Sequence, residues 1–412
     1  MIKVLRENWA LFAGMLMLMA ANGLLVTVLT IRGASLGFSE TVIGLMQACY
    51  PLGALIGSAV TPKLIERVGH VRSFGALASL CSIASIVHLI TTDPWSWGAM
   101  RFLAGLCFPG LYVIAESWLN AKAANNMRAI TLSIYFVIQT LGASAGQQLA
   151  GMKDPSGMFL FGLASILVSL SLVPLLLSHT QAPEYHAPER LSIIRLARIS
   201  PMSVSGTFLN GIAQAAFYTT VPLYGLALGL GATEAASLLV VGTLAGAALQ
   251  FPIGWVSDRM DRRVVVGALS VLTTIMGVSV AVGLWGNSPF SVMVIAGASI
   301  LPVYSLCVAH GNDLIKPSQI VPASGTMVLT LNIGILCGAF LGPFMIGHFG
   351  PDGLMGLWAV VGAITAVTAV ARRISSNVPE ETGIAQPITV QGTQMTGALH
   401  PDAEYPDQTT GQ

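Results

Sequence analysis

Charged residues are scarce in this sequence. Only 9% of its 412 residues are Asp, Glu, Lys or Arg, whereas 54% are hydrophobic, and a soluble chain has roughly a quarter charged residues. The charges sum to a net +1 without a basic block, so the charge pattern gives no indication of nucleic-acid binding. This composition predicts an integral membrane protein that is in contact with the lipid bilayer.

Motifs for catalysis and metal binding are also missing. The five cysteines lie in apolar runs without a CxxC spacing, which predicts neither a disulfide nor a metal site. No G-x-x-x-x-G-K-S/T loop occurs, and no strand-to-helix turn that would form a nucleophile elbow is predicted. We therefore expect no ATP hydrolysis, no enzyme activity and no cofactor.

Long apolar runs are what the sequence has in abundance. A bilayer core of about 30 Å requires about 20 helical residues, and each backbone amide in it must be bonded within its own segment. Twelve runs meet this length, which predicts an all-α membrane protein with twelve transmembrane helices. The predicted helices cover residues 9–31, 42–61, 73–91, 96–120, 129–150, 158–177, 203–226, 235–256, 264–285, 290–311, 321–346 and 353–371.

Basic residues predict the orientation. With twelve crossings almost all Lys and Arg residues fall on one side, and the opposite loops contain only Arg32 and Lys153. Because basic loops stay in the cytoplasm, both termini are expected there. The segment 372–412, rich in Thr, Gln, Pro and Gly, is expected to form a disordered cytoplasmic tail.

The chain contains an internal repeat. A shift of 192 residues places Arg67 on Arg259 and Tyr112 on Tyr304, and the stretches LGFSE and LGATE recur at a similar spacing. Repeats of this size predict two pseudo-symmetric six-helix bundles. The predicted parts are an N-terminal bundle (1–177), a cytoplasmic linker (178–202) and a C-terminal bundle (203–371).

Two loops resemble a pattern of the major facilitator superfamily of secondary transporters, Gly-x-x-x-Asp-Arg-x-Gly followed by basic residues. GWVSDRMDRR at 254–263 has most of this pattern, and PKLIERVGHVR at 62–72 is a degenerate copy. RFLAG at 101–105 is similar to the family's Arg-x-x-x-Gly on helix 4, and ESWLN at 116–120 is similar to a poorly characterised bacterial branch. The resemblance covers about residues 9–371.

The resemblance implies a secondary active transporter of a small organic solute, in which the two bundles rock around a midplane site to give alternating access. It also implies a bacterial cytoplasmic (inner) membrane protein. Efflux of drug-like compounds and uptake of a metabolite both stay open. The alternative is a non-transporting membrane sensor or assembly protein on the same fold. Expected partners are a small-molecule substrate, the lipid bilayer and protons, with no nucleic acid, and we expect a monomer.

Two charges, Arg101 and Glu116, lie within one predicted helix. A rise of about 1.5 Å per residue separates them by roughly 22 Å, too far for a salt bridge. Arg101 and Tyr112 share a helix face. Arg101 either extends to the outer headgroups or faces a cavity, where it binds an anionic substrate group or perturbs a proton carrier. The resemblance favours the cavity, because the family's helix 4 arginine is associated with proton coupling.

Glu116 has three interpretations: a proton carrier, an inner-gate residue paired with Arg67 or Arg72, or a carboxylate for a cationic substrate. Its position near the cytoplasmic end of the helix favours the gate. The predicted cytoplasmic gate comprises Glu66, Arg67, Arg72, Glu116, Asp258, Arg259 and Arg262.

The resemblance implies that helices 1, 4, 7 and 10 line a central cavity. For each polar residue on them, a helix–helix hydrogen bond is the alternative interpretation. Isolated histidines predict no metal site, although His310 is a second candidate proton carrier. The predicted cavity and coupling residues are Asn22, Arg101, Tyr112, Asn210, Gln214, Tyr218, Tyr304 and His310.

Glycines recur at a spacing of four in three predicted helices, in GALIG at 53–57, GASAG at 142–146 and GTLAG at 242–246. A Gly-x-x-x-Gly spacing lets two helix backbones approach closely in a membrane. We therefore expect these helices to pack on a neighbour through their glycines.

Overall fold

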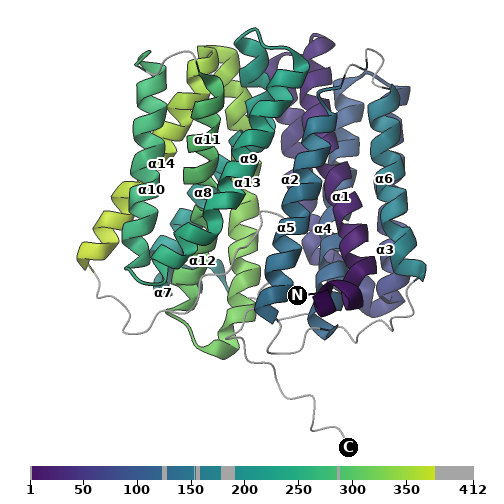
Figure 1. Cartoon of the computed structure of the whole chain (residues 1–412), viewed down its shortest axis with the longest axis horizontal. Coiled ribbons are helices and arrows are strands. Elements are labelled where there is room, and N and C mark those ends of the chain that lie inside the picture. The colour runs from purple at the N-terminus through teal and green to yellow at the C-terminus, as the bar shows by residue number, and fades with distance from the viewer. Residues whose placement is uncertain are drawn as a thin grey trace, which may run out of the picture.

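The computed structural model describes residues 2–122, 128–152, 154, 158–177, 191–284 and 288–375, and the remainder of the predicted linker and tail lies outside them. The described chain is helical without a strand, which confirms the predicted all-α membrane fold (Figure 1). The helices are α1 (Ile2–Ser35), α2 (Glu40–Val68), α3 (His70–Ile90), α4 (Pro94–Lys122), α5 (Arg128–Leu149), α6 (Met158–Leu177), α7 (Ile193–Ile199), α8 (Pro201–Ala227), α9 (Ala232–Ser257), α10 (Arg262–Ala281), α11 (Pro289–Ile300), α12 (Val303–Asn312), the 3₁₀ turn η2 (Pro317–Gln319), α13 (Ile320–Phe349) and α14 (Pro351–Ser375).

Ten segments of the described chain are long and apolar enough to cross a bilayer. They correspond to ten of the twelve predicted spans, with α11 and α12 counted as one. The other two predictions, 129–150 and 203–226, form α5 and α8, which have spanning length but are not among the ten. Polar residues such as Gln139 on α5 and Asn210 on α8 lower their hydropathy.

The predicted helix 290–311 is interrupted. α11 ends at Ile300, and α12 begins at Val303 after a turn at Leu301 and Pro302. The cause is Pro302, which has no N–H to donate to the preceding helical turn. The interruption leaves the carbonyls of Ile300 and Leu301 available to side chains of α8.

Helix pairing is the same in the two parts of the chain. In the first part, α1 packs on α5 and α6, α2 on α4, and α3 on α4 and α6. In the second part, α8 packs on α13 and α14, α9 on α11, and α10 on α11 and α14. The order of helices makes these equivalent pairs, as expected for an internal repeat.

Glycines make this pairing close, as predicted. A Cβ added at Gly105 would lie 2.0 Å from the carbonyl oxygen of Tyr50, and one at Gly297, 192 residues later, would lie 1.9 Å from that of Gly242. Gly146 on α5 contacts α1 in the same way. Only glycine permits backbones to approach so closely.

The two parts also contact each other, through α2 with α13, α5 with α9 and α1 with α8. We call the end of the bundle that carries the loop residues 66–72 and 258–263 the basic end, and the end that carries residues 35–40 and 227–232 the far end. Hydrogen bonds link the parts toward the far end: Thr233 donates to the carbonyl of Gly151 at 2.6 Å, Thr30 donates to that of Thr219 at 3.3 Å, and Gln148 contacts Ser237. The two parts are therefore in contact at the far end.

Replacing Gly297 by alanine should destabilise the protein, because the added methyl forces α9 and α11 apart. Overpacking of this kind costs about 1–3 kcal/mol. Gly162→Ala on α6 is the matched control, because no atom lies within 4 Å of its added Cβ. Thermal unfolding in detergent measures both variants, and an equal Tm for the two would contradict the close-packing interpretation.

Candidate functional site

A central cavity of about 190 Å³ lies between the two parts of the chain. Its wall combines aliphatic groups with hydroxyls and side-chain amides, and Arg101 is the single charged residue among the described residues that line it. The polar and aromatic lining residues are Asn22, Gln47, Tyr50, Ser58, Arg101, Tyr112, Phe136, Gln139, Thr140, Gln147, Tyr218, Thr219, Thr243, Gln250 and Asn332.

Arg101 is buried in this wall, with 2% of its surface exposed. Its guanidinium carbon lies 4.5 Å from the centroid of the Tyr50 ring, a cation–π contact that partly compensates for lost hydration. Within the described chain, its Nε and Nη1 have no hydrogen-bond acceptor. The structure therefore places Arg101 in the cavity rather than at the headgroups, with donors available to a ligand.

Neutral polar groups elsewhere in the wall are incompletely bonded. The Nε2 and Oε1 atoms of Gln139 on α5 and the hydroxyl of Tyr112 on α4 make no well-formed hydrogen bond among the described residues, although Tyr112 interacts with Tyr50 and Gln139 with Tyr135. Gln47 on α2 donates to Thr30 at 2.8 Å, but its Oε1 is also unpaired in that part of the chain. Buried polar groups cost free energy unless they are bonded, so these groups favour a polar ligand.

Four of the eight predicted cavity residues line the cavity, namely Asn22, Arg101, Tyr112 and Tyr218. The prediction named only residues of helices 1, 4, 7 and 10, whereas the described wall also includes α2, α5, α9 and α13. Gln139 and Gln147 were missed for this reason. Their signal was present, because two amides eight residues apart lie on one face of an apolar helix.

Asn210 and Gln214 do not line this cavity. Asn210 donates from Nδ2 to the carbonyl oxygen of Ile300 at 2.8 Å, and Gln214 donates to Asn210 at 2.6 Å and to the carbonyl of Leu301 at 3.5 Å. They bond the carbonyls at the interruption between α11 and α12. The alternative interpretation, a helix–helix hydrogen bond, describes these two residues.

Tyr304 and His310, both on α12, are buried away from the described cavity wall. Tyr304 packs in an apolar cluster with Leu196 of α7 and Met327 of α13. The repeat aligns Tyr112 with Tyr304, and both were predicted to line the cavity, but only Tyr112 reaches it.

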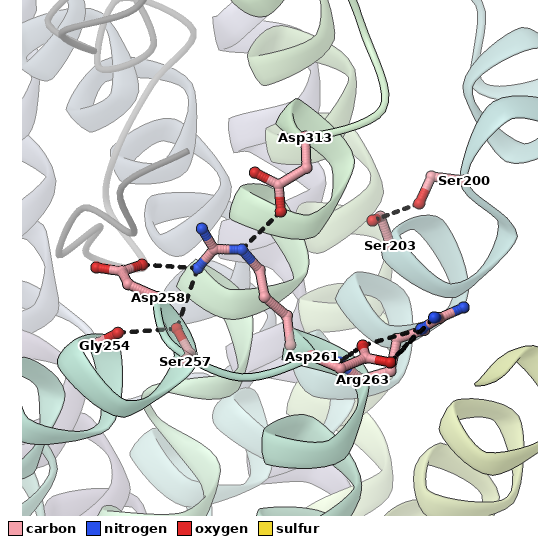
Figure 2. A network of polar contacts seen from close by, with 9 residues as sticks. Ser200, Ser203, Gly254, Ser257, Asp258, Asp261, Arg263 and Asp313 are labelled. Atoms are coloured by element: carbon pink, nitrogen blue, oxygen red, sulfur yellow. Dashed lines mark hydrogen bonds and ion pairs between the residues drawn. The ribbon is translucent and has the colours of Figure 1, made fainter. Parts of the chain in front are cut away.

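Arg262, one of the predicted gate residues, is the centre of a buried ionic cluster at the basic end. Figure 2 labels its partners Ser257, Asp258 and Asp313. Its Nε donates to Asp313 at 2.7 Å, and its Nη1 donates to Asp258 at 2.9 Å and to Ser257 at 3.0 Å. Asp258 caps the C-terminus of α9 and Asp313 that of α12. These contacts tie α10 to the ends of α9 and α12. We call the four residues that make them the arginine clamp: Arg262, Asp258, Ser257 and Asp313.

Asp261 precedes the arginine clamp and caps the N-terminus of α10. Its carboxylate accepts from the backbone N–H and from the Nε of Arg263, each at 3.0 Å. Partial burial alone would raise the pKa of Asp261, but the hydrogen bonds and the charge of Arg263 outweigh it, so the pKa lies below its ordinary value. Asp261 is therefore ionised near neutral pH, and its hydrogen bonds to Arg263 hold the turn between α9 and α10 in place.

The first part of the chain does not repeat this cluster. Glu66, Arg67 and Arg72 are exposed, and His70, which occupies the position of Arg262 in the repeat, stacks on Trp118 with ring centroids 5.8 Å apart. The remaining predicted gate residue of the second part, Arg259, is exposed and lies over the Trp255 ring.

Glu116 is completely buried, and its Oε1 accepts a hydrogen bond from the hydroxyl of Tyr135 at 2.8 Å. In the described chain it forms no ion pair with Arg67 or Arg72. The favoured gate pair is thus not formed in this conformation. Tyr135 of α5 is a partner that the sequence prediction did not name.

A bundle of membrane-spanning helices around a central cavity with a few polar groups is typical of membrane transporters. The sequence profile of the Major Facilitator Superfamily matches residues 11–318 and, in a second overlapping match, 203–389. The chain belongs to the major facilitator superfamily, as the loop motifs predicted. The family is one of transporters rather than enzymes.

Relatives and solved structures agree with this assignment. An uncharacterized MFS-type transporter of Enterobacter sp. (strain 638) is 28% identical over 80% of this chain and 86% of its own length. The uncharacterized MFS-type transporter YcaD of Escherichia fergusonii is 26% identical over 87% of this chain and 94% of its own. These bacterial relatives confirm the predicted branch. The nucleoside transporter NupG has a similar fold, with a TM-score of 0.70 and 12% identity over 88% of this chain and 97% of that chain. A D-xylose-proton symporter also has a similar fold, with a TM-score of 0.68 and 14% identity over 92% of this chain and 98% of that chain.

Arg262→Ala should destabilise the protein, because it leaves Asp313, whose side chain is 2% exposed, without this cation. Breaking a buried ion pair costs about 3–5 kcal/mol. The control is Arg259→Ala, an exposed cation whose loss should cost no more than about 1 kcal/mol. Thermal unfolding in detergent gives both values, and a Tm for Arg262→Ala no lower than that of the control would show that the arginine clamp is dispensable.

Proposed function

We propose that this protein is a secondary active transporter that moves a small organic solute across the bacterial cytoplasmic membrane by alternating access. The observation that carries the proposal is the central cavity, mostly apolar with one cation and several neutral polar groups, between two parts with equivalent helix pairs that touch at the far end. In this family fold, a midplane cavity between repeats is where solute binds.

All twelve predicted helices span the membrane in this proposal. The two that fall short in hydropathy, α5 and α8, pack inside the bundle against α1 and α13, and intramembrane polar residues are tolerated where they face protein or a cavity. Residues 1–177 and 203–371 are the two moving bundles, and 178–202 is their linker. The concentration of Lys and Arg at the basic end makes that end, with both termini, cytoplasmic.

Alternation requires that the far end opens. The hydrogen bonds there join neutral groups: Thr233 with Gly151, Gln148 with Ser237 and Thr30 with Thr219. A neutral hydrogen bond contributes only about 1 kcal/mol net, so this closure is readily reversible. In the opposite conformation the exposed charges Glu66, Arg67 and Arg72 close the cytoplasmic end together with the arginine clamp.

Proton coupling is the second element of the proposal, and we assign it to Glu116. A carboxylate inside a membrane bundle is expensive when ionised, and the hydrogen bond from Tyr135 holds this one in place. Protonation of Glu116 would remove a buried charge and so favour one conformation over the other. His310, buried at the end of α12, is the alternative carrier.

Crosslinking the far end should stop transport. Gln148→Cys with Ser237→Cys, in a variant without the native cysteines, can be joined by a short reducible bis-thiosulfonate reagent. Proteoliposomes loaded with a bacterial metabolite extract are followed by mass spectrometry. We expect solute efflux that the crosslink abolishes and a reductant restores. The single-cysteine variants are controls, and the absence of protein-dependent efflux would support the non-transporting sensor.

Glu116→Gln should abolish accumulation driven by a pH gradient while leaving solute exchange across the membrane intact, because glutamine binds no proton at this position. The measurement uses the solute identified by efflux, in proteoliposomes with an imposed pH gradient. Glu66→Gln, at an exposed carboxylate, is the control for loss of an acid. Unchanged concentrative transport by Glu116→Gln would refute the carrier role and support the gate role.

A further inference from the structure

We propose that the solute is a small organic monoanion, a carboxylate with a neutral hydrogen-bonding remainder, and that Arg101 binds its charged group. This inference deepens the proposed function and rests on it, because it names the substrate class of the same cavity. It is carried by the charge and hydrogen-bonding state of the cavity wall.

The charge balance of the wall is the first observation. Arg101 contributes one positive charge, and no carboxylate occurs among the described residues of the wall. A buried cation in a membrane bundle requires a partner or water, and the ring of Tyr50 offers it only a quadrupole. One fixed charge calls for one opposite charge on the ligand.

The geometry of the guanidinium is the second observation. Two of its nitrogens, Nε and Nη1, are buried without an acceptor in the described chain. Nε and Nη1 lie on different edges of the planar guanidinium, so each can donate a separate charge-assisted hydrogen bond to a carboxylate oxygen at its own edge. The Tyr50 ring covers one face of the guanidinium, so a ligand approaches its edge, where the donors point.

The rest of the ligand must be uncharged, and it meets a wall that is mostly apolar with several neutral polar groups. Tyr112 lies three turns beyond Arg101 on α4, on the same face but about 16 Å further along the axis, so it lines the path to Arg101 rather than the site of the carboxylate itself. There its hydroxyl and both polar atoms of Gln139 make no well-formed hydrogen bond within the described residues, although Tyr112 interacts with Tyr50 and Gln139 with Tyr135. Amides and a phenol supply both donors and acceptors without selecting a second charge. The aromatic rings of Tyr50, Tyr112 and Tyr218 on the wall also accommodate a flat or apolar portion.

Binding of matched probes to the full-length protein in detergent tests this inference. The pairs are 4-hydroxybenzoate with 4-hydroxybenzamide, nicotinate with nicotinamide, and lactate with lactamide, with 4-hydroxybenzamidine as the cationic analogue and phenyl phosphate as the dianion. Members of a pair differ in charge and hardly in shape. We expect at least one carboxylate to bind about tenfold or more tightly than its amide, as charge-assisted hydrogen bonds allow.

The variants are Arg101→Gln, Arg101→Lys and the control Arg198→Gln, at an exposed cation on α7. Arg101→Gln should reduce carboxylate affinity about tenfold or more without weakening amide binding, Arg101→Lys should retain part of it, and the control should bind as the parent protein does. The comparison of carboxylate with amide in the parent protein needs no variant, so misfolding of Arg101→Gln would leave the test intact.

Several outcomes would overturn the inference: no binding by any of the three carboxylates, equal affinity for carboxylate and amide, preference for the amidine, tighter binding of phenyl phosphate, or carboxylate affinity that Arg101→Gln leaves unchanged. The transport proposal fails separately. Carboxylate binding without flux in proteoliposomes would refute transport and leave the anion site standing, whereas flux restricted to neutral or cationic solutes would do the reverse.

Discussion

Close backbone contact at glycine is the constraint on which the rest of this structure depends. Lipid offers helices no hydrophobic reason to associate, so the bundle needs contacts that lipid cannot match. Gly105 against Tyr50 and Gly297 against Gly242 provide them at the same place in both parts of the chain. Because these contacts are made by backbone and small residues, the neighbouring faces of α4 and α5 are free to carry polar side chains into the cavity.

The two parts share their packing but differ in their charges. Arg101 and Glu116 lie on α4, whereas the equivalent positions of the second part are Met293 and Val308. The second part instead has the arginine clamp, where the first has His70 stacked on Trp118. The glycine contacts are repeated in both parts because each part must hold together in lipid. The charged residues differ between the parts because the single shared cavity needs each charge only once.

How much of this could be predicted from the sequence follows from the range of the interactions. Apolar runs and Gly-x-x-x-Gly spacings are local, and they predicted the helices and their close pairs. Arg101 could be located because a charge in an apolar run has few places to lie. The hydrogen bonds from Asn210 and Gln214 to the carbonyls of Ile300 and Leu301 could not be predicted. They depend on the helix interruption at Pro302, and the sequence shows Pro302 only as one of several intramembrane prolines.

The same reasoning explains the residues that were missed. Asp313 follows α12 and meets Arg262 only when α10 and α12 are packed, and no local pattern links positions 51 residues apart. Gln139 was overlooked because the family expectation assigned the cavity to four helices. Its own sequence context, an amide in the middle of a span, indicated a buried role independently of any family.

The position of Arg101 also links substrate binding to the conformational change in the proposed mechanism. It lies about 10 Å of helix rise from the start of α4 at the far end. An empty cavity that closes at the basic end would shut an uncompensated cation away from water, which is costly in low dielectric. An anion bound to Arg101 neutralises that charge before closure. The loaded cavity then closes more readily than the empty one, and this difference couples solute binding to the conformational change.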